Sequence, residues 1–431
     1  MKVLVIGSGG REHALVWKIA QSPLVKELYA APGNGGIAEL AKIVDLNAED
    51  VDALAEFAED KDIDLTVVGP EAPLAKGIVD EFENRRLRIF GPTKSGARLE
   101  SSKSFTKQLL KKLNVPTANF AIFDDASAAR AYVKQAGLPV VVKADGLCGG
   151  KGVIVATSQS EALGAIDLMM EDKIFKRAGE RIVIEEFLPG EEASVFVLTD
   201  GKHAIPLAPA QDYKRLQDGD KGPNTGGMGA YSPAPVVSEE MMTRIMNSII
   251  LPVVQGLAKE GVKYRGVLYA GLMLTSDGPY VLEFNARFGD PELQAVLPRL
   301  RGDLVELMEA AIDGKLDRVQ LAWDARSAAC IVLASGGYPG EYQIGKPIRG
   351  LDAVKRQADV LVFHAGTKRE GSQMLTWGGR VLNVIALDDG IDGAVKKAYR
   401  AVDQIQFEGM QCRRDIAWRA LKPGDIKRGA T

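Results

Sequence analysis

A glycine-rich segment with two lysines, residues 140–156 (VVVKADGLCGGKGVIVA), is the first candidate for chemistry in the sequence. Lys143 ends a predicted strand, and Lys151 lies in the following loop with Gly146, Gly149, Gly150 and Gly152. Glycines let backbone N–H groups approach phosphate oxygens, and lysines neutralise phosphate charge. Because the loop leads into another strand and not into a helix, it is not a Walker loop. The pattern favours a phosphate-binding loop over a tight hairpin with a solvated lysine.

A second candidate is residues 281–294 (VLEFNARFGDPELQ). Glu283, Asn285 and Arg287 alternate along a predicted strand, so their side chains share one face. Two oxygen ligands followed by a guanidinium suit a magnesium ion and a phosphoryl group in transfer. The alternative is a polar strand face in solvent, which the flanking apolar residues and the abrupt GDPE turn disfavour.

A third segment, residues 183–195 (VIEEFLPGEEASV), is a predicted strand that ends in two acids and a turn. Such a strand can hold adenine by its backbone edge and ribose by a carboxylate. Taken by itself the segment is unspecific, and solvated acids are the simpler interpretation.

Together and in this order, the three segments resemble the ATP-grasp superfamily over roughly residues 101–320. The resemblance implies that Lys103 and Lys143 contact the ATP phosphates under the loop of Gly149, Gly150, Lys151 and Gly152. It also implies adenine contacts from Glu185 and the backbone near Leu188, a ribose contact from Glu192, metal ligands Glu283 and Asn285, and an acyl-phosphate contact from Arg287. Many members carry a further acidic ligand on the preceding strand, where this chain has Tyr269, Ala270 and Gly271. The full set of metal ligands is therefore left open.

Five motifs narrow the resemblance to the glycinamide ribonucleotide synthetase (phosphoribosylamine–glycine ligase) family: GSGGREHAL, VGPEAPL, KADGLCGGKGV, GPNTGGMGAYSP and RFGDPE. The match extends over essentially the whole chain, including ASGGYPG and FHAGT near its end. RFGDPE is highly specific to that family, and the amino-terminal glycine motif is not. The resemblance implies ATP-dependent ligation of glycine to 5-phosphoribosylamine through glycyl phosphate, in purine biosynthesis, with Mg²⁺ or Mn²⁺.

The amino-terminal loop, Gly7 to His13, follows a strand and opens a helix, where free N–H groups attract phosphate. A dinucleotide site is disfavoured, because the second strand ends in Tyr29–Ala30–Ala31–Pro32 without the acid that binds a ribose diol. We therefore assign Gly9, Gly10, Arg11 and Glu71 to the phosphoribosylamine half of the site. The alternative is an ordinary strand-to-helix turn.

By the same resemblance, Asp212 and the segment 222–231 border this cleft. The substrate-binding residues expected there are Asp212, Asn224, Arg287 and Asp290, with an exposed loop as the rival interpretation. Arg413 and Arg414 could face the substrate phosphate, although a solvated pair is the simpler interpretation. Cys148 is expected to be a small packing residue, because no histidine lies beside it in the sequence. His13 is expected to be structural more than substrate-binding.

The elements that must position these residues fall into three regions. Residues 1–90 repeat a strand-then-helix pattern, which predicts a doubly wound parallel sheet whose ligands lie beyond the carboxyl ends of its strands. The expected domains are a substrate-binding α/β domain (1–100), an ATP-grasp α+β domain (101–325, with a small nucleotide lobe at about 118–190) and a smaller α+β domain (326–431). A hairpin is predicted around Ser276–Asp277–Gly278.

Composition limits the remaining possibilities. The chain has 431 residues and a formal net charge of -3, which argues against a nucleic-acid or membrane-surface binder. MKVLVIGSGG suits a first strand better than a signal peptide, and no stretch approaches about 18 uninterrupted apolar residues. Three dispersed cysteines suit free thiols in the cytoplasm. We expect a cytoplasmic enzyme, monomeric, with ATP, glycine and phosphoribosylamine as its partners.

Three rival functions stay open at this point. The same fold can ligate a different carboxylate or amine, which RFGDPE and the intact amino-terminal motif disfavour. A nicotinamide-dependent oxidoreductase would rest on the first strand and glycine loop alone. A nucleotide-binding module without turnover is disfavoured by the presence of Lys143, Glu283, Asn285 and Arg287.

Overall fold

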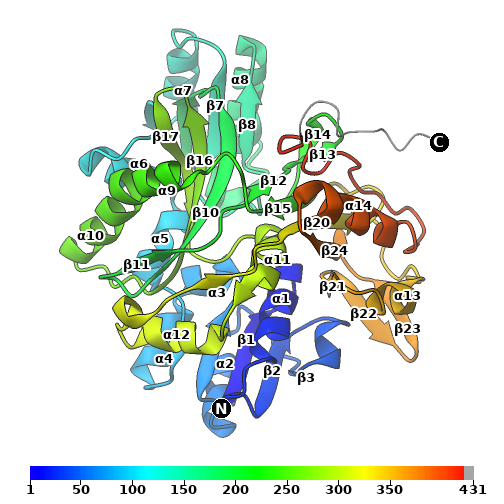
Figure 1. The fold of residues 1–431 in the computed structure, drawn as a ribbon. Coiled ribbons are helices and arrows are strands. Elements are labelled where there is room, and N and C mark those ends of the chain that lie inside the picture. The colour runs from blue at the N-terminus through cyan, green and yellow to red at the C-terminus, as the bar shows by residue number, and fades with distance from the viewer. Residues whose placement is uncertain (422–431) are drawn as a thin grey trace.

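The computed structural model describes residues 1–421. Its principal sheets are a five-stranded parallel sheet, two four-stranded antiparallel sheets and a five-stranded antiparallel sheet. In Figure 1 the parallel sheet lies at the bottom, the lobe with β7 and β8 at the top, and the last sheet at the right. The candidate site therefore has to be sought where these layers meet.

Five parallel strands form the N-terminal sheet in the order β3-β2-β1-β4-β5. Their bounds are β1 Lys2–Gly7, β2 Glu27–Pro32, β3 Lys42–Ile43, β4 Leu65–Val68 and β5 Ile89–Phe90. Val3 and Val5 share a buried cluster with Leu15 of α1 (Gly10–Ile19). Leu4 and Ile6, on the other face, share a different cluster with the helices that follow, so both faces are covered. The predicted doubly wound sheet is confirmed.

Two antiparallel sheets follow in the central part of the chain. The first has the order β6-β9-β7-β8, with bounds Phe120–Phe123, Ile182–Glu186, Val140–Ala144 and Val153–Ala156. The second has the order β11-β10-β16-β17, with bounds Ala204–Pro206, Glu191–Thr199, Gly266–Thr275 and Gly278–Asn285. Thr275 pairs with Gly278, so the predicted hairpin turns through Ser276 and Asp277.

The last large sheet has the order β12-β15-β20-β24-β21. Its strands are β12 Gln211–Asp212, β15 Gly229–Ser232, β20 Ser327–Ala334, β24 Arg380–Asp388 and β21 Val360–His364. The glycine-rich segment 212–233 thus contributes paired strands to a sheet whose other members come about 100 residues later. It also contains the hairpin of β13 (Arg215–Gln217) and β14 (Lys221–Asn224).

Helices and short strands complete the fold. The helices are α2 Val51–Asp60, α3 Glu71–Lys76, α4 Ile78–Asn84, α5 Lys94–Ser101, α6 Lys103–Lys112, α7 Ala126–Val133, α8 Gln159–Ile166, α9 Glu239–Ile245, α10 Leu251–Lys259, α11 Glu292–Val296, α12 Leu304–Ile312, α13 Leu351–Lys355 and α14 Ile391–Val402. The remaining pairs are β18 Leu300–Arg301 with β19 Ala322–Trp323, and β22 Thr367–Glu370 with β23 Gln373–Thr376.

Residues 239–259, from α9 to α10, form a helix that is long and apolar enough to cross a membrane by length and composition alone. Ile245, Ile249 and Val253 are fully buried, in one cluster with strand residues of β10 and β16. The apolar face of this helix is therefore explained by packing on the second antiparallel sheet.

His13 of α1 and His364 of β21 form a buried contact between the first and last sheets. The backbone N–H of His364 donates to His13 Nδ1 at 2.8 Å, and the ring centroids are 5.6 Å apart. Burial, aided by the charge of Lys355, lowers the pKa of each histidine to about 3. Glu39, which pairs with Lys355 and Arg369, opposes this shift at His13. Both rings are therefore neutral in the folded chain at neutral pH.

We expect the free energy of unfolding to fall as the pH drops below the ordinary histidine value of 6.5. The unfolded chain takes up protons first, so stability is full above that pH and is lost toward the folded pKa of about 3. Each histidine contributes a slope of at most about 1.4 kcal/mol per pH unit. Urea unfolding of the wild type and His13→Gln, which keeps an acceptor but takes no proton, should give a shallower decline for the variant. Parallel declines would contradict this account.

Candidate active site

One cavity of about 630 Å³ lies where the two antiparallel sheets, the N-terminal sheet and the last sheet meet. Sixteen predicted site residues line it: Arg11, Glu71, Lys103, Lys143, Gly149, Gly150, Gly152, Glu185, Leu188, Glu192, Asp212, Asn224, Glu283, Asn285, Arg287 and Asp290. Three others do not line it: Gly9, Gly10 and Lys151. The fold therefore brings residues more than 200 positions apart into one space.

A buried ion triad lies on the side of the cavity where the nucleotide is expected. Lys143 Nζ lies 2.9 Å from Glu185 Oε1, and Lys107 Nζ of α6 lies 2.8 Å from Glu185 Oε2. The sequence suggested that Glu185 meets adenine, but its carboxylate is held between two lysines. Lys103, one helical turn before Lys107, reaches toward Gly146 O at 3.5 Å. Three lysine ammonium groups thus border the space in which the triphosphate is expected.

The candidate metal ligands Glu283 and Asn285 stand at the end of β17, beside these lysines. Although burial raises it, the charges of Lys214, Lys103 and Lys143 hold the pKa of Glu283 below its ordinary value. A carboxylate that stays ionised and an amide oxygen are ligands that Mg²⁺ accepts. Two protein ligands leave room for phosphate oxygens and water.

β16, the strand before β17, carries no acid beside Glu283, but an acid from another element, Glu292, lines the cavity. Gly271 of β16 pairs with Glu283, and Tyr269 donates its hydroxyl to Glu292 Oε1 at 2.6 Å. Glu292, at the start of α11, is buried and lines the same cavity. A carboxylate from α11 therefore lines the cavity and is held by Tyr269 of β16, the strand on which many ATP-grasp proteins carry an acid.

Arg287 lies two residues beyond β17, in a non-helical segment, and still faces the cavity. Its Nε lies 3.1 Å from Glu71 Oε2, and its Nη2 lies 2.8 Å from Glu100 Oε1. Burial raises the pKa of Glu100 to about 7. By contrast, Arg287 and Arg11 overcome burial and lower the pKa of Glu71 to about 2. Arg287 is thus oriented by two carboxylates of unequal charge.

The amino-terminal glycine loop is filled by a protein carboxylate. Gly9 N–H donates to Glu12 Oε2 at 2.6 Å, and Arg11 Nε donates to Glu12 Oε1 at 2.6 Å. A Cβ at Gly7, Gly9 or Gly69 would come within 2.7 Å of the Glu12 side chain. These glycines make room for Glu12, which accepts the N–H of Gly9, one of the groups that the sequence suggested for a ligand phosphate.

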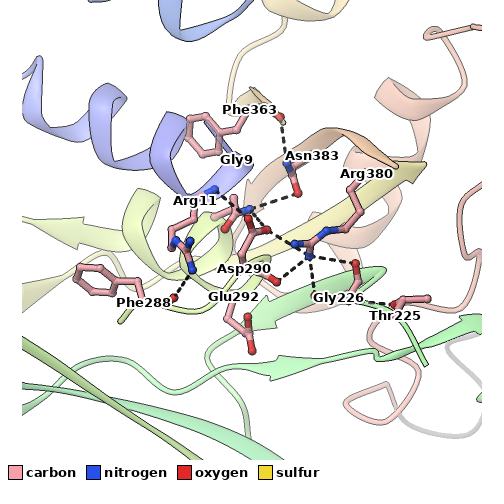
Figure 2. Close-up of polar contacts among 12 residues, drawn as sticks. Gly9, Arg11, Thr225, Gly226, Phe288, Asp290, Glu292, Phe363, Arg380 and Asn383 are labelled. Atoms are coloured by element: carbon pink, nitrogen blue, oxygen red, sulfur yellow. Dashed lines mark hydrogen bonds and ion pairs between the residues drawn. The ribbon is translucent and has the colours of Figure 1, made fainter. Parts of the chain in front are cut away.

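Asp290 of the RFGDPE motif joins three parts of the fold (Figure 2). It accepts the N–H of Arg11 at 3.4 Å and an N–H of Gln294 at 2.8 Å. Arg380 of β24 lies 3.3 Å from its carboxylate and donates to the carbonyls of Asp290 and Gly226 at 2.7 and 2.6 Å. In Figure 2 the guanidinium of Arg380 points to Asp290 and Gly226 from the last sheet.

The loop of residues 146–152 reaches the last domain through its lysine. Lys151 Nζ donates to the carbonyl of Pro339 at 2.8 Å and does not line the cavity. Tyr338, next to that proline, accepts the N–H of Gly226 at 2.9 Å. Burial raises the pKa of the Cys148 thiol, which agrees with a packing role. The loop is therefore fastened over the cavity by a contact that the sequence did not indicate.

Acids and a lysine gather at the rim of the cavity near β10. Lys214 Nζ lies 3.1 Å from Glu192 Oε2 and 4.0 Å from Asp212 Oδ1. Burial and the carboxylates of Glu292 and Glu192 raise the pKa of Asp212. Asn224 Nδ2 donates to Val153 O at 3.3 Å, which joins the β13–β14 hairpin to the end of the 146–152 loop.

Arg413 and Arg414 do not line the cavity. Arg413 is fully buried and lies 2.8 Å from Asp220 and 2.7 Å from Asp415. Arg414 is half exposed and pairs with Asp403 at 2.7 Å. Arg419, six residues after Arg413, is the arginine of this segment that lines the cavity.

The sequence reasoning missed several charged residues that line the cavity: Glu100, Lys107, Lys214, Glu292, Arg380 and Arg419. A signal existed for Lys107, because it follows Lys103 by four residues and must share its helix face. Lys214 follows Asp212 by two residues in the polar segment. Arg380 and Arg419 carried no such signal, since only the tertiary fold brings them to this site.

Comparison with known proteins agrees with this geometry. Family models for phosphoribosylglycinamide synthetase match residues 1–100 (N domain), 101–293 (ATP-grasp domain) and 328–419 (C domain). The phosphoribosylamine–glycine ligase of Vibrio cholerae is 54% identical over 424 residues, with 98% of this chain and 99% of the relative covered. That of Ralstonia nicotianae is 52% identical over 423 residues, with 98% of this chain and 100% of the relative covered.

A crystal structure of the phosphoribosylamine–glycine ligase of Thermotoga maritima superposes with a TM-score of 0.85 at 33% sequence identity. The superposition covers 97% of this chain and 100% of that one. These matches include all three regions of the fold and the last sheet, which contains Arg380. The chain therefore belongs to the phosphoribosylglycinamide synthetase family, with an ATP-grasp domain at its centre.

Proposed function

We propose that this chain ligates glycine to 5-phosphoribosylamine at the expense of ATP, in purine biosynthesis. A carboxylate oxygen of glycine attacks the γ-phosphorus, and ADP leaves. The amine of phosphoribosylamine then attacks the carbonyl of glycyl phosphate, phosphate leaves, and the nitrogen loses a proton. The products are glycinamide ribonucleotide, ADP and phosphate.

The observation that carries this proposal is the convergence of Lys143, Glu283, Asn285 and Arg287 on one cavity in a chain that matches this family over 98% of its length. Direct amine attack on a carboxylate is slow because the leaving group is poor, and phosphorylation supplies a better one. Cations that surround the developing charge are the expected means of lowering that barrier.

For the nucleotide we propose that Lys103 and Lys143 contact the phosphates, with Gly149, Gly150 and Gly152 above them. Leu188 and its neighbours contact adenine, and Glu192 contacts ribose. The proposal is supported by the position of all of these residues on the cavity wall. A closed loop would exclude water, which otherwise hydrolyses the acyl phosphate.

The divalent metal of ATP-grasp enzymes fits the donors present here. Glu283 and Asn285 would hold it, and we propose Mg²⁺ with Mn²⁺ as a substitute, because both donors are hard oxygens. Bound there, the ion would draw charge from the phosphate oxygens during transfer. Among the described residues no group of three or more His, Cys, Asp or Glu side chains forms a separate metal cage.

For the acceptor half of the site we propose Arg11, Glu71, Asp212, Asn224 and Asp290. Arg11 donates to Phe288 O at 3.0 Å, which keeps its guanidinium at the cavity wall. Gly9 and Gly10 contribute indirectly under this proposal, since a Cβ at Gly10 would strike Asn383 of β24. We also propose that the enzyme is a cytoplasmic monomer, a setting that its three free cysteines suit.

The test is ADP release from ATP and Mg²⁺, with glycine present and phosphoribosylamine generated in place or omitted. ADP formation that needs both substrates supports the ligase. Release that is independent of either would point to another carboxylate or amine. No release with any substrate would favour a nucleotide-binding protein without this reaction.

Replacing Lys151 with alanine should lower kcat about tenfold or more and leave the unfolding temperature nearly unchanged. The physical reason is that its bond to Pro339 O holds an exposed loop closed, and exposed hydrogen bonds contribute little to global stability. Lys134→Ala, an exposed lysine of the same lobe, is the matched control. Full activity in Lys151→Ala would show that the contact with the last domain is not needed for loop closure.

A further inference from the structure

Lys107, Glu185 and Lys143 form a triad of charged side chains that is almost completely buried. The exposed fractions of the three side chains are 3%, 1% and 6%. Two lysines and one carboxylate leave a net charge of about one positive unit in a poorly solvated place. Burial of this kind is costly unless every charge is paired, so the arrangement needs an explanation.

The two lysines contact Glu185 differently. Lys107 Nζ donates to Glu185 Oε2 at 2.8 Å and to Thr117 Oγ1 at 2.6 Å, and is thereby committed to protein groups. Lys143 forms an ion pair with Oε1 that lacks the alignment of a hydrogen bond. Lys143 Nζ instead donates a hydrogen bond to Leu282 O at 3.1 Å. N–H groups of Lys143 therefore remain for an acceptor in the cavity.

The triad is also tied to the strand that carries the candidate metal ligands. Leu282, whose carbonyl Lys143 contacts, lies in an irregularity between Val281 and Glu283, where the register with β16 shifts. Thr117, bound to Lys107, donates its hydroxyl to Val281 O at 2.7 Å. Lys143 directly, and Lys107 through Thr117, thus contact the two consecutive carbonyls that precede Glu283.

We propose that Lys107 is a positioning residue that neutralises Glu185, so that the charge of Lys143 stays available to the ATP phosphates. This inference rests on the proposed function, since it assigns Lys143 to the nucleotide. Glu185 fixes the place of Lys143, and Lys107 prevents Glu185 from cancelling its charge. Without Lys107 the remaining pair would be neutral and would attract an anion less strongly.

The first test is MgADP binding to the full chain by calorimetry, with ATP KM and kcat measured beside it. Lys107→Met should weaken MgADP binding about tenfold and raise KM for ATP by a similar factor. Lys107→Arg, which keeps the charge, should restore most of the affinity. Lys112→Met is the matched control, because that lysine ends the same helix in an exposed ion pair with Glu260.

A double variant separates charge balance from packing. In Lys107→Met/Glu185→Gln the carboxylate is gone as well, so Lys143 again carries an unpaired charge. The proposal expects tighter MgADP binding by the double variant than by Lys107→Met alone. A purely structural role of Lys107 predicts equal or weaker binding, which would overturn the proposal. This comparison also stands if Lys107→Met is less stable than the wild type.

A pH series gives an independent readout. Burial and the charge of Lys143 lower the pKa of Lys107 to about 8, against the opposing carboxylates of Glu185 and Glu283. MgADP affinity of the wild type should therefore fall as the pH rises through about 8, and Lys107→Arg should remove that decline. ADP carries no substrate amine, so glycine and phosphoribosylamine do not contribute to the profile.

The outcomes distinguish the inference from the function it rests on. Wild-type ligation with unchanged MgADP affinity in Lys107→Met would overturn the role of Lys107 and leave the ligase assignment intact. If Lys107→Met loses affinity and the double variant recovers it, the role of the triad is supported. If the wild type at the same time shows no ligation, the ligase assignment is overturned.

Discussion

Glu283→Gln is expected to lower the rate of ligation by about 100-fold or more while the chain stays folded. Glutamine preserves the shape of the side chain at the end of β17 but removes the charge that would hold the divalent ion. The carboxylate is kept ionised by three lysines and Arg287, so its electrostatic role is larger than that of an isolated acid. ADP formation with both substrates, measured across Mg²⁺ concentrations, is the readout.

Arg287→Ala tests the guanidinium that is proposed to contact the acyl phosphate. Its removal would leave Glu71 and Glu100 facing the cavity without their guanidinium, and we expect a loss of similar size, about 100-fold. Asp277→Asn, at the exposed turn before β17, is the matched control, because it changes a charge without changing the cavity. Wild-type turnover by either active-site variant would refute the roles given to Glu283 and Arg287.

Arg413→Met is expected to lower the free energy of unfolding by about 3 kcal/mol. The guanidinium is fully buried, contacts Asp220 and Asp415, donates to Arg215 O at 3.1 Å and lies 4.8 Å over the ring of Tyr213. Methionine fills part of the space but leaves Asp415 without its cation and Asp220 with Arg419 alone. The β13–β14 hairpin, which carries Asp220 in its turn, would lose one of its contacts with the end of the last domain and keep those of Arg419 and Arg414.

The neighbouring Arg414 supplies the control. Its ion pair with Asp403 is about half exposed on both sides, so Arg414→Met should cost at most about 1 kcal/mol. Urea unfolding of both variants measures the difference. Equal losses would mean that burial is not what gives Arg413 its importance, and a large loss of ligation in Arg414→Met would revive a substrate role for that residue.

The parts of the fold that the sequence predicted are those governed by short-range periodicity. The apolar run before Gly7 and the helix after it give the first strand and α1, and the two-residue turn at Ser276 gives the β16–β17 hairpin. The alternation of Glu283 and Asn285 likewise predicts a shared face. Arg287 lines the same cavity, but it lies beyond the end of β17. The predicted alternation along a strand therefore does not explain its position.

Long-range contacts account for what the sequence did not reveal. Glu12 accepts the N–H of Gly9 in a local capping contact, but nothing local shows that it also fills the space beside Gly69, because that space exists only after β1, β4 and α1 are packed. Similarly, Lys151 on a glycine loop suggests phosphate, and its contact with Pro339 depends on a domain nearly 190 residues away. Side-chain type predicted the chemistry, and tertiary packing decided which partner each charge meets.

The insertion of β12 and β15 into the last sheet bears on how a ribosome-bound chain can acquire activity. β15 is synthesised about 100 residues before β20, its hydrogen-bonded neighbour. The backbone groups on that edge of β15 therefore stay unpaired until β20 has left the ribosome. Arg380 and Arg419 come later still. Synthesis from the amino end therefore completes the walls of the cavity at a late stage, and a nascent chain that already holds Lys143 and Glu283 lacks an enclosed place in which an acyl phosphate could survive.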